Sequence, residues 1–317
     1  MDSIVKRLAE RTSWLLFAVA AGFVSAALRR WQLSTAFEDV TGLAIPGAQA
    51  SVILACVLVM SAAWFILSAI HQPMAKRPPV EGQAERWDLV FLDAGDPVYP
   101  ILVILAAFLA LAATPFFLKL GIDQWRVYQE LLAAKAENPS VQLPSSNGAL
   151  TIATAVGALL SFLGLLQMGR DGFRPGRRGK GGFSAVLPGI AGCVWLMESF
   201  RGHAANPVQW DYAPLLLAIV CGMLFYMDFA GMSAGAGRPR RLLWVSAMTL
   251  VMSAPALVSA LADMSLGDVL LLCAQGLTAA AVLWRLPPNL EHPPKIKGTP
   301  IPRQTGEATI QEETTDE

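Results

Sequence analysis

Charged side chains are scarce in this chain of 317 residues. They make up 15% of the residues, whereas hydrophobic residues make up 54%, and the mean hydropathy is +0.48. A soluble domain of ordinary composition carries about 25% charged residues. Because a soluble protein must cover its surface with polar groups, this composition excludes an ordinary soluble protein. It predicts a chain that is surrounded in part by lipid.

An excess of charge of either sign is also missing. The 24 Lys and Arg residues balance the 24 Asp and Glu residues, so the formal net charge is zero. Nucleic-acid-binding proteins carry a basic patch or stripe that attracts phosphates. We therefore expect no nucleic acid among the partners.

Metal-binding and catalytic motifs are missing as well. The chain has three histidines and four cysteines, and every cysteine lies inside an apolar run with no C-x-x-C pair. This pattern favours neither a disulfide framework nor a zinc site. The motifs H-E-x-x-H, G-x-S-x-G, Walker A and the dinucleotide glycine fingerprint are all absent. We therefore expect no metal and no cofactor, and we lean toward a chain that is not an enzyme.

Long apolar runs are the main feature that is present. A membrane-spanning helix needs about 20 apolar residues, and about eight runs of this kind cover residues 1–285. They lie near residues 14–28, 51–70, 98–120, 149–168, 183–199, 212–230, 242–261 and 266–284. The sequence therefore predicts an all-α fold, a polytopic transmembrane helical bundle that contacts the lipid bilayer.

The first run has a second interpretation. Lys6, Arg7 and Arg11 precede a short apolar stretch that ends in small residues near position 26, which is also the pattern of a cleaved signal peptide. We favour a retained span, because seven further spans make a removable targeting segment unnecessary.

The distribution of basic residues predicts the orientation. With eight spans, the N-terminus, the loops at 71–97, 169–182 and 231–241, and the C-terminal tail share one side, and they hold 18 of the 24 Lys and Arg residues. The other side includes the loops 29–50, 121–148 and 200–211. Because basic loops stay in the cytoplasm, both termini are predicted to lie inside the cell. Residues 286–317, which are rich in proline and end in acidic residues, are predicted to form a disordered cytoplasmic tail.

The outer side carries one further predicted element, within the stretch "IDQWRVYQELLAAKAE". Its apolar residues recur at steps of mostly three and four: Ile122, Trp125, Tyr128, Leu131 and Leu132. This spacing predicts an amphipathic helix, which either continues the third span or lies on the outer leaflet.

The stretch "ESFRGHAANPVQWDY" is the main candidate polar site. It carries Glu198, Arg201, His203 and Asp211 between the fifth and sixth spans. Glu198 and Arg201 are three residues apart, so they can pair on one helical face. His203 is predicted to lie in the loop. Two interpretations follow: a polar rim where two helices turn around, or a ligand or proton site at the mouth of the bundle.

Two more polar residues lie inside the predicted spans. Asp228 is near the inner end of the sixth span, where the following arginines could neutralise it, and Gln275 lies deepest in the last span. An amide at that depth is typical of a hydrogen bond between helices. Pro188 and two glycines in "LPGIAG" further predict a kink or an unwound turn in the fifth span.

The sequence assigns no activity. The leading hypothesis is a non-enzymatic scaffold or partner subunit in a bacterial inner membrane, bound to another membrane protein or to further copies of itself. The alternative is a small-solute transporter that uses the kinked fifth span. A membrane enzyme is the third hypothesis, because catalytic groups can converge from distant helices.

Overall fold

The computed structural model describes residues 2–38, 43–74, 96–138, 140, 142–144, 148–173, 184–203, 208–233 and 237–291, with the backbone alone for residues 2–12, 209 and 210. Within these ranges the chain forms eight helices and one isolated bridge, between Phe37 and Ala44, and no strand. The prediction of an all-α transmembrane bundle is confirmed.

The helices follow the apolar runs but extend beyond most of them. They are α1 (Asp2–Thr35), α2 (Gln49–His71), α3 (Val98–Glu137), α4 (Ala149–Gly172), α6 (Val186–His203), α7 (Gln209–Ser233), α8 (Pro239–Ala262) and α9 (Leu266–Glu291). Seven of them are long and apolar enough to cross a membrane. The eighth, α6, is not among these seven, because Glu198, Arg201 and His203 occupy its last turns.

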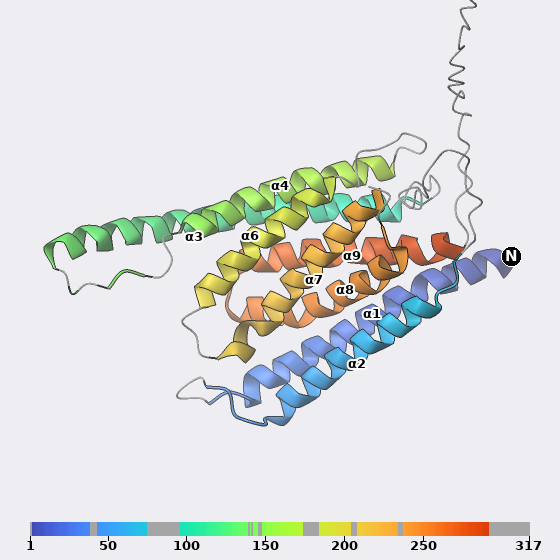
Figure 1. The fold of residues 1–317 in the computed structure, drawn as a ribbon, viewed down its shortest axis with the longest axis horizontal. Coiled ribbons are helices and arrows are strands. Elements are labelled where there is room, and N and C mark those ends of the chain that lie inside the picture. Colours follow the sequence, from blue (N-terminus) through green and yellow to red (C-terminus); the bar gives the residue numbers. More distant parts are fainter. Residues whose placement is uncertain are drawn as a thin grey trace, which may run out of the picture.

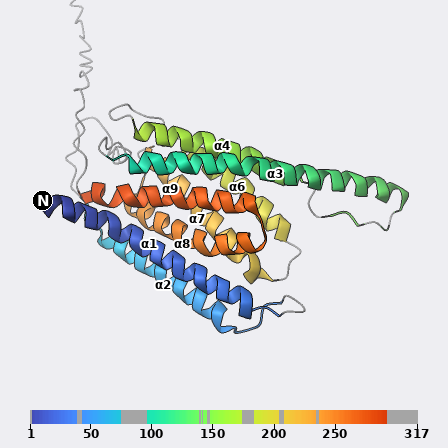
Figure 2. The same ribbon diagram turned by 180° about the vertical axis from the view of Figure 1, so that it is seen from behind.

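The bundle has a central pair of helices with a hairpin on either side (Figures 1 and 2). The pair consists of α8 and α9, which pack on each other; α1 and α2 contact α8 on one side, and α3 contacts α9 on the other. Beyond α8 and α9, α7 joins α8 to α6, and α6 joins α7 to α4. The α8 and α9 helices contain the largest sets of buried residues, so they form the core.

The N-terminus and the end of α9 lie at the same end of the bundle, which we call the N-terminal end (Figure 1). The connections α1–α2, α3–α4, α6–α7 and α8–α9 lie at the opposite end, which we call the distal end. The arrangement agrees with an even number of crossings. The side of the membrane that each end faces stays a prediction.

All eight helices differ from their predicted bounds, and three of these differences change a predicted loop, the tail or the outer element. The α1 helix continues to Thr35, so the loop that was expected from residue 29 begins later. The α9 helix continues to Glu291, so the first residues of the expected tail are helical, and residues 292–317 lie outside the described part. Residues 122–137 continue α3 as one helix, which decides between the two arrangements considered for this stretch.

The predicted kink or unwound turn at Pro188 stays a prediction; a turn at Ala185 separates Ser184 from the start of α6. Pro188 is the third residue of that helix, and proline is tolerated in the first turn because its missing N–H group has no partner there. The small residues that follow allow close packing against α4. A Cβ atom on Gly157 of α4, for example, would lie 3.2 Å from the Cβ atom of Ala191.

Candidate functional site

Polar side chains gather at the distal end, where α1, α6, α7 and the α8–α9 connection meet. Of the residues predicted from the sequence, Glu198, Arg201, His203 and Asp211 lie at this end. Asp228 and Gln275 lie elsewhere in the bundle. The distal end also contains a residue that the sequence analysis assigned to a loop, Arg29.

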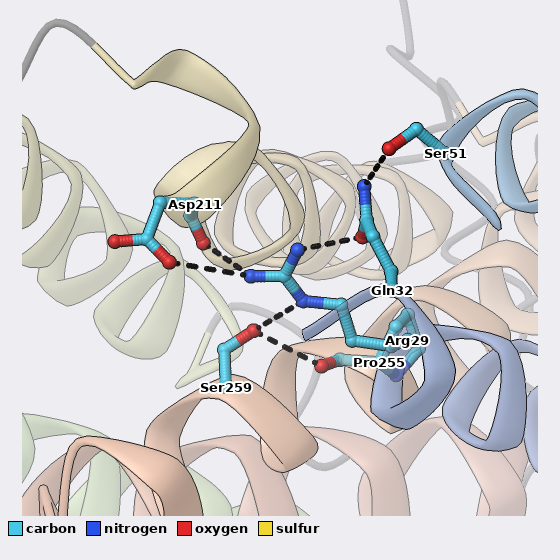
Figure 3. Close-up of polar contacts among 6 residues, drawn as sticks. All are labelled: Arg29, Gln32, Ser51, Asp211, Pro255 and Ser259. Carbon is cyan, nitrogen blue, oxygen red and sulfur yellow. Dashed lines mark hydrogen bonds and ion pairs between the residues drawn. The ribbon is translucent and has the colours of Figure 1, made fainter. Parts of the chain in front are cut away.

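Arg29 is fully buried and is bound by three helices (Figure 3). Its Nε donates to Ser259 Oγ of α8 at 2.9 Å, and its Nη1 donates to Gln32 Oε1 of α1 at 2.6 Å. Its Nη2 donates to the main-chain oxygen of Asp211 at 2.5 Å and lies 3.7 Å from the carboxylate oxygen Oδ1. A charge at this depth is stable only when it is paired and hydrogen-bonded, and these contacts meet that requirement.

The Arg29 network extends to a fourth helix. The Gln32 amide is also fully buried and donates to Ser51 Oγ of α2 at 2.8 Å (Figure 3). Ser259 Oγ in turn donates to the Pro255 carbonyl oxygen at 3.4 Å. The network therefore joins α1, α2, α7 and α8 at the distal end. Such polar bonds help to hold helices together in a membrane, because the hydrophobic effect does not favour helix association in lipid.

Glu198 contacts α4. The Thr151 hydroxyl lies 3.2 Å from Glu198 Oε1 and 2.9 Å from Gln124 Oε1 of α3, and it can donate to one of them at a time. Arg201 lies on the exposed side of α6. Glu198 therefore takes part in a junction of α3, α4 and α6, a contact that its spacing from Arg201 did not reveal.

A second carboxylate of the distal end, Asp268 of α9, was not singled out from the sequence. Trp195 of α6 donates its Nε1–H to Asp268 Oδ1 at 2.7 Å, and the Ser265 hydroxyl donates to Oδ2. Asp268 lies in the first turn of α9, where the helix dipole favours a negative charge. The position of Asp268 at the start of a predicted span could have indicated a helix start from the sequence. Its bond to Trp195 depends on the tertiary packing.

His203 is the last residue of α6, not part of the loop as predicted. Its ring stacks on Tyr212 of α7 with centroids 5.1 Å apart and an interplanar angle of 24°. Its Nδ1 lies 2.7 Å from the Ser199 carbonyl oxygen. Because that oxygen can only accept, Nδ1 carries the proton in this contact.

Asp263 follows the last residue of α8, outside the membrane-spanning segments. Partial burial among its neighbours raises the pKa of its carboxyl group, and the charge of Asp211 raises it further. His203 and Arg29 act in the opposite direction. The distal end thus brings acidic groups close to one buried guanidinium.

Gln275 joins three helices deep in the bundle. Its Nε2 donates to the Ala218 carbonyl oxygen of α7 at 2.8 Å and lies 3.4 Å from Ser253 Oγ of α8. A Cβ atom on Gly222 would lie 2.1 Å from Gln275 Oε1, so a larger residue there would force this amide to move. The interpretation of Gln275 as a hydrogen-bonded link between helices is confirmed.

Asp228 and Arg285 lie toward the N-terminal end. Asp228 Oδ2 pairs with Arg241 Nε at 2.9 Å, as the nearby arginines indicated. Arg285 is fully buried in α9, with its guanidinium carbon 5.0 Å from the centre of the Tyr99 ring. Arg285 is not among the residues predicted from the sequence, because the predicted span ends at Trp284.

A cavity of about 30 Å³ lies inside the bundle among α3, α4, α6, α7 and α9. Trp195, Gln275 and Tyr226 line it, together with small and apolar residues, whereas Glu198 and Arg201 do not. A water molecule needs roughly 10–15 Å³ on this measure, so the cavity has room for about two. Trp195 lines the cavity and also donates to Asp268 of the distal end.

Within the described residues, no group of three or more His, Cys, Asp or Glu side chains is arranged to hold a metal ion. Comparisons with protein-family models, with curated proteins and with solved structures give no match. The function is therefore argued from the geometry of the helices and their polar contacts.

Proposed function

We propose that the chain is a non-enzymatic scaffold or partner subunit of a bacterial inner membrane. The observation that supports this most directly is that polar side chains inside the bundle bond to neighbouring helices. Arg29, Asp268 and Gln275 each link two or more helices. Side chains that link helices stabilise one arrangement of the bundle, which suits a subunit that presents a fixed surface.

The size of the interior cavity also favours this role. Sites for small molecules are usually clefts or cavities of about 300–1,000 Å³, whereas the cavity between the helices holds about 30 Å³. A sugar or an amino acid is too large for that space. Large apolar side chains are instead exposed on α1 and α2, including Phe23, Val59 and Met60, and these faces can contact lipid or another membrane protein.

The experiment that tests the proposal is purification of the full-length protein from its native membrane in a mild detergent. We expect it to elute in a complex of fixed stoichiometry, measured by native mass spectrometry. Reconstitution into proteoliposomes is the opposing measurement. Solute uptake above the background of empty vesicles, abolished by Glu198→Gln, would overturn the proposal.

A small-solute transporter is the second candidate, and one observation favours it. Pro188 and Gln275 line the cavity, deep between the helices. Glu198 of α6 and Asp268 of α9 lie nearer the distal end of the same helices. Rotation of α6 would open that space toward the rim. Uptake that Gln275→Leu reduces, in a variant that keeps its thermal stability, is the result that would favour transport.

A membrane enzyme that acts on lipid or on an extracytoplasmic substrate is the third candidate. Glu198, His203 and Asp268 supply acid–base groups at one end of the bundle. Lipid analysis of cells that overproduce the protein tests this activity, with His203→Gln as the matched variant. We expect the two lipid profiles to be identical.

A further inference from the structure

The α3 helix is much longer than its neighbours. Its 40 residues extend over about 60 Å at a rise of 1.5 Å per residue. The α4 helix begins beside Gly121, because a Cβ atom on Gly148 would lie 2.4 Å from the Gly121 carbonyl oxygen. Residues 122–137 of α3 therefore extend past the start of α4, as Figures 1 and 2 show. We call this segment the distal arm.

The composition of the distal arm fits an aqueous environment. It carries five charged residues: Asp123, Arg126, Glu130, Lys135 and Glu137. The apolar part of α3 ends before them, near Leu120. A single helix of this length is only marginally stable in water. The arm therefore gains stability from any partner that covers its apolar residues.

One face of the distal arm is apolar and exposed. Ile122, Trp125 and Leu132 are 38%, 43% and 43% exposed, and Gln129 and Ala136 are exposed between and after them. We call these five residues the distal stripe. Their spacing alternates between three and four, which is the seam of a two-stranded coiled coil. The neighbouring face, at Gln124 and Tyr128, is half-buried and lies outside the stripe.

At its base the distal stripe continues onto α4. Ile122 and Trp125 form an apolar groove of about 320 Å³ with Ala149 and Ile152 of α4. The groove continues the surface along which α3 and α4 pack inside the bundle, where Ile152 lies against Gly121. A helix that covered the stripe would therefore also cover this groove.

We propose that the distal stripe pairs with the distal stripe of a second copy of this chain, as a parallel two-stranded coiled coil. All copies enter the membrane in the same orientation, because the same basic loops orient each of them. Two arms therefore extend from the membrane side by side, in the same direction and at the same height. This inference rests on the proposed role as a partner subunit and names a second copy as the partner.

The side chains along the stripe fit a parallel pair in register. Gln129 lies in the middle of the seam, and a single polar side chain at such a position specifies the register of the pair. At the flanks, Gly121 would face Arg126 of the other copy, and Tyr128 would face Ala133. No two like charges are thereby placed opposite each other. Glu130 lies on the outer side of the arm, away from the seam, so it does not oppose pairing.

Disulfide cross-linking in native membranes tests the pairing. Gln129→Cys is made in a chain whose four native cysteines are replaced by serine, and Glu130→Cys is the matched control on the outer side of the arm. After mild oxidation, we expect most of the Gln129→Cys protein to migrate as a dimer and at least tenfold less of the control to do so. Equal yields from the two variants, or no dimer from either, would overturn the pairing.

Charge substitutions provide a second test that does not depend on cysteine. Trp125→Lys and Leu132→Lys place charges on the stripe, whereas Val127→Lys changes a side chain that is 51% exposed on another face. We expect native mass spectrometry of detergent-purified protein to show dimer for the wild type and Val127→Lys, and mostly monomer for the other two. Thermal unfolding of each variant shows that the bundle is folded.

The two proposals fail in different ways. A wild-type monomer that copurifies with a different membrane protein at a fixed ratio overturns the second copy as partner but leaves the partner-subunit role in place. Solute uptake that depends on Glu198 overturns the partner-subunit role, whatever the oligomeric state.

Discussion

Each end of the bundle fully buries one arginine, Arg29 at the distal end and Arg285 at the N-terminal end. Arg29 donates directional hydrogen bonds to Ser259, Gln32 and Asp211. Arg285 lies over the face of the Tyr99 ring. A directional network fixes the angles between its helices, whereas a ring face accepts a cation in many orientations. The Arg29 network is therefore expected to be more sensitive to a change of side chain than the contact of Arg285 with the Tyr99 ring.

Replacement of Arg29 tests this difference most strongly. Arg29→Ala leaves the buried Ser259 and Gln32 side chains without their donor, so we expect a loss of about 3–5 kcal/mol in the free energy of unfolding, at about 1–3 kcal/mol for each unsatisfied buried group. The neighbouring Arg30 is exposed, and Arg30→Ala should change stability by about 0.5 kcal/mol or less. Unfolding of the purified protein by SDS measures both values. Equal losses for the two variants would contradict the role of the Arg29 network.

A substitution at Gly222, between the two ends, tests whether only the distal end loses stability when a side chain is changed. Gly222→Ala would place a methyl group 2.1 Å from Gln275 Oε1. We expect it to cost about 3 kcal/mol, at the upper end for overpacking. Gly202→Ala is the control, because no atom lies within 4 Å of its Cβ position. A variant as stable as the wild type would mean that the Gln275 amide can move without loss.

The Tyr99 ring tests the N-terminal end. Tyr99→Leu removes the aromatic face beneath Arg285, so we expect a loss of about 2 kcal/mol, the value for a cation–π contact away from water. Tyr99→Phe keeps the face and should lose about 1 kcal/mol or less. The same SDS titration measures both. If Phe and Leu were equally harmful, the hydroxyl group and not the ring face would be the stabilising feature.

The two arginines also show what the sequence could predict. Apolar length located every helix, because a bilayer requires about 20 apolar residues for each crossing. The first arginine after an apolar run marked the end of a span at residue 28, yet α1 continues to Thr35 and buries Arg29. Its partner Asp211 is 182 residues away, and no local pattern reveals a pairing of that kind.

The polar residues in the other helices likewise include some whose role the sequence predicts and some whose contacts depend on the packed structure. Gln275 was interpreted correctly, because an amide at that depth has few alternatives to a hydrogen bond with a neighbouring helix. Glu198 was matched to Arg201 by helical spacing, which stays a prediction; its contact with Thr151 of α4 was not predicted. The direction in which α6 faces depends on its contact with α4, at Gly157 and Ala191. That contact is a property of the packed bundle.

The smallest effect is expected at Asp263, at the edge of the Arg29 network. Its pKa is raised in the folded protein, first by partial burial and then by Asp211, so its protonated form favours folding. The wild type should therefore gain stability as the pH falls from 7 to below about 4, the usual pKa of an aspartate, and lose that gain as the pH rises again.

Asp263→Asn removes this dependence on pH. Because Asp263 is only partly buried and more than a third exposed, solvent screens its charge, and we expect the variant to be more stable than the wild type at pH 7 by about 0.5 kcal/mol or less. The two should be equally stable at low pH. Thermal unfolding at several pH values measures the difference, with Asp123→Asn on the distal arm as the control. A variant less stable than the wild type at pH 7 would mean that Asp263 stabilises Arg29 more than it repels Asp211, and the Arg29 network would then include a second carboxylate.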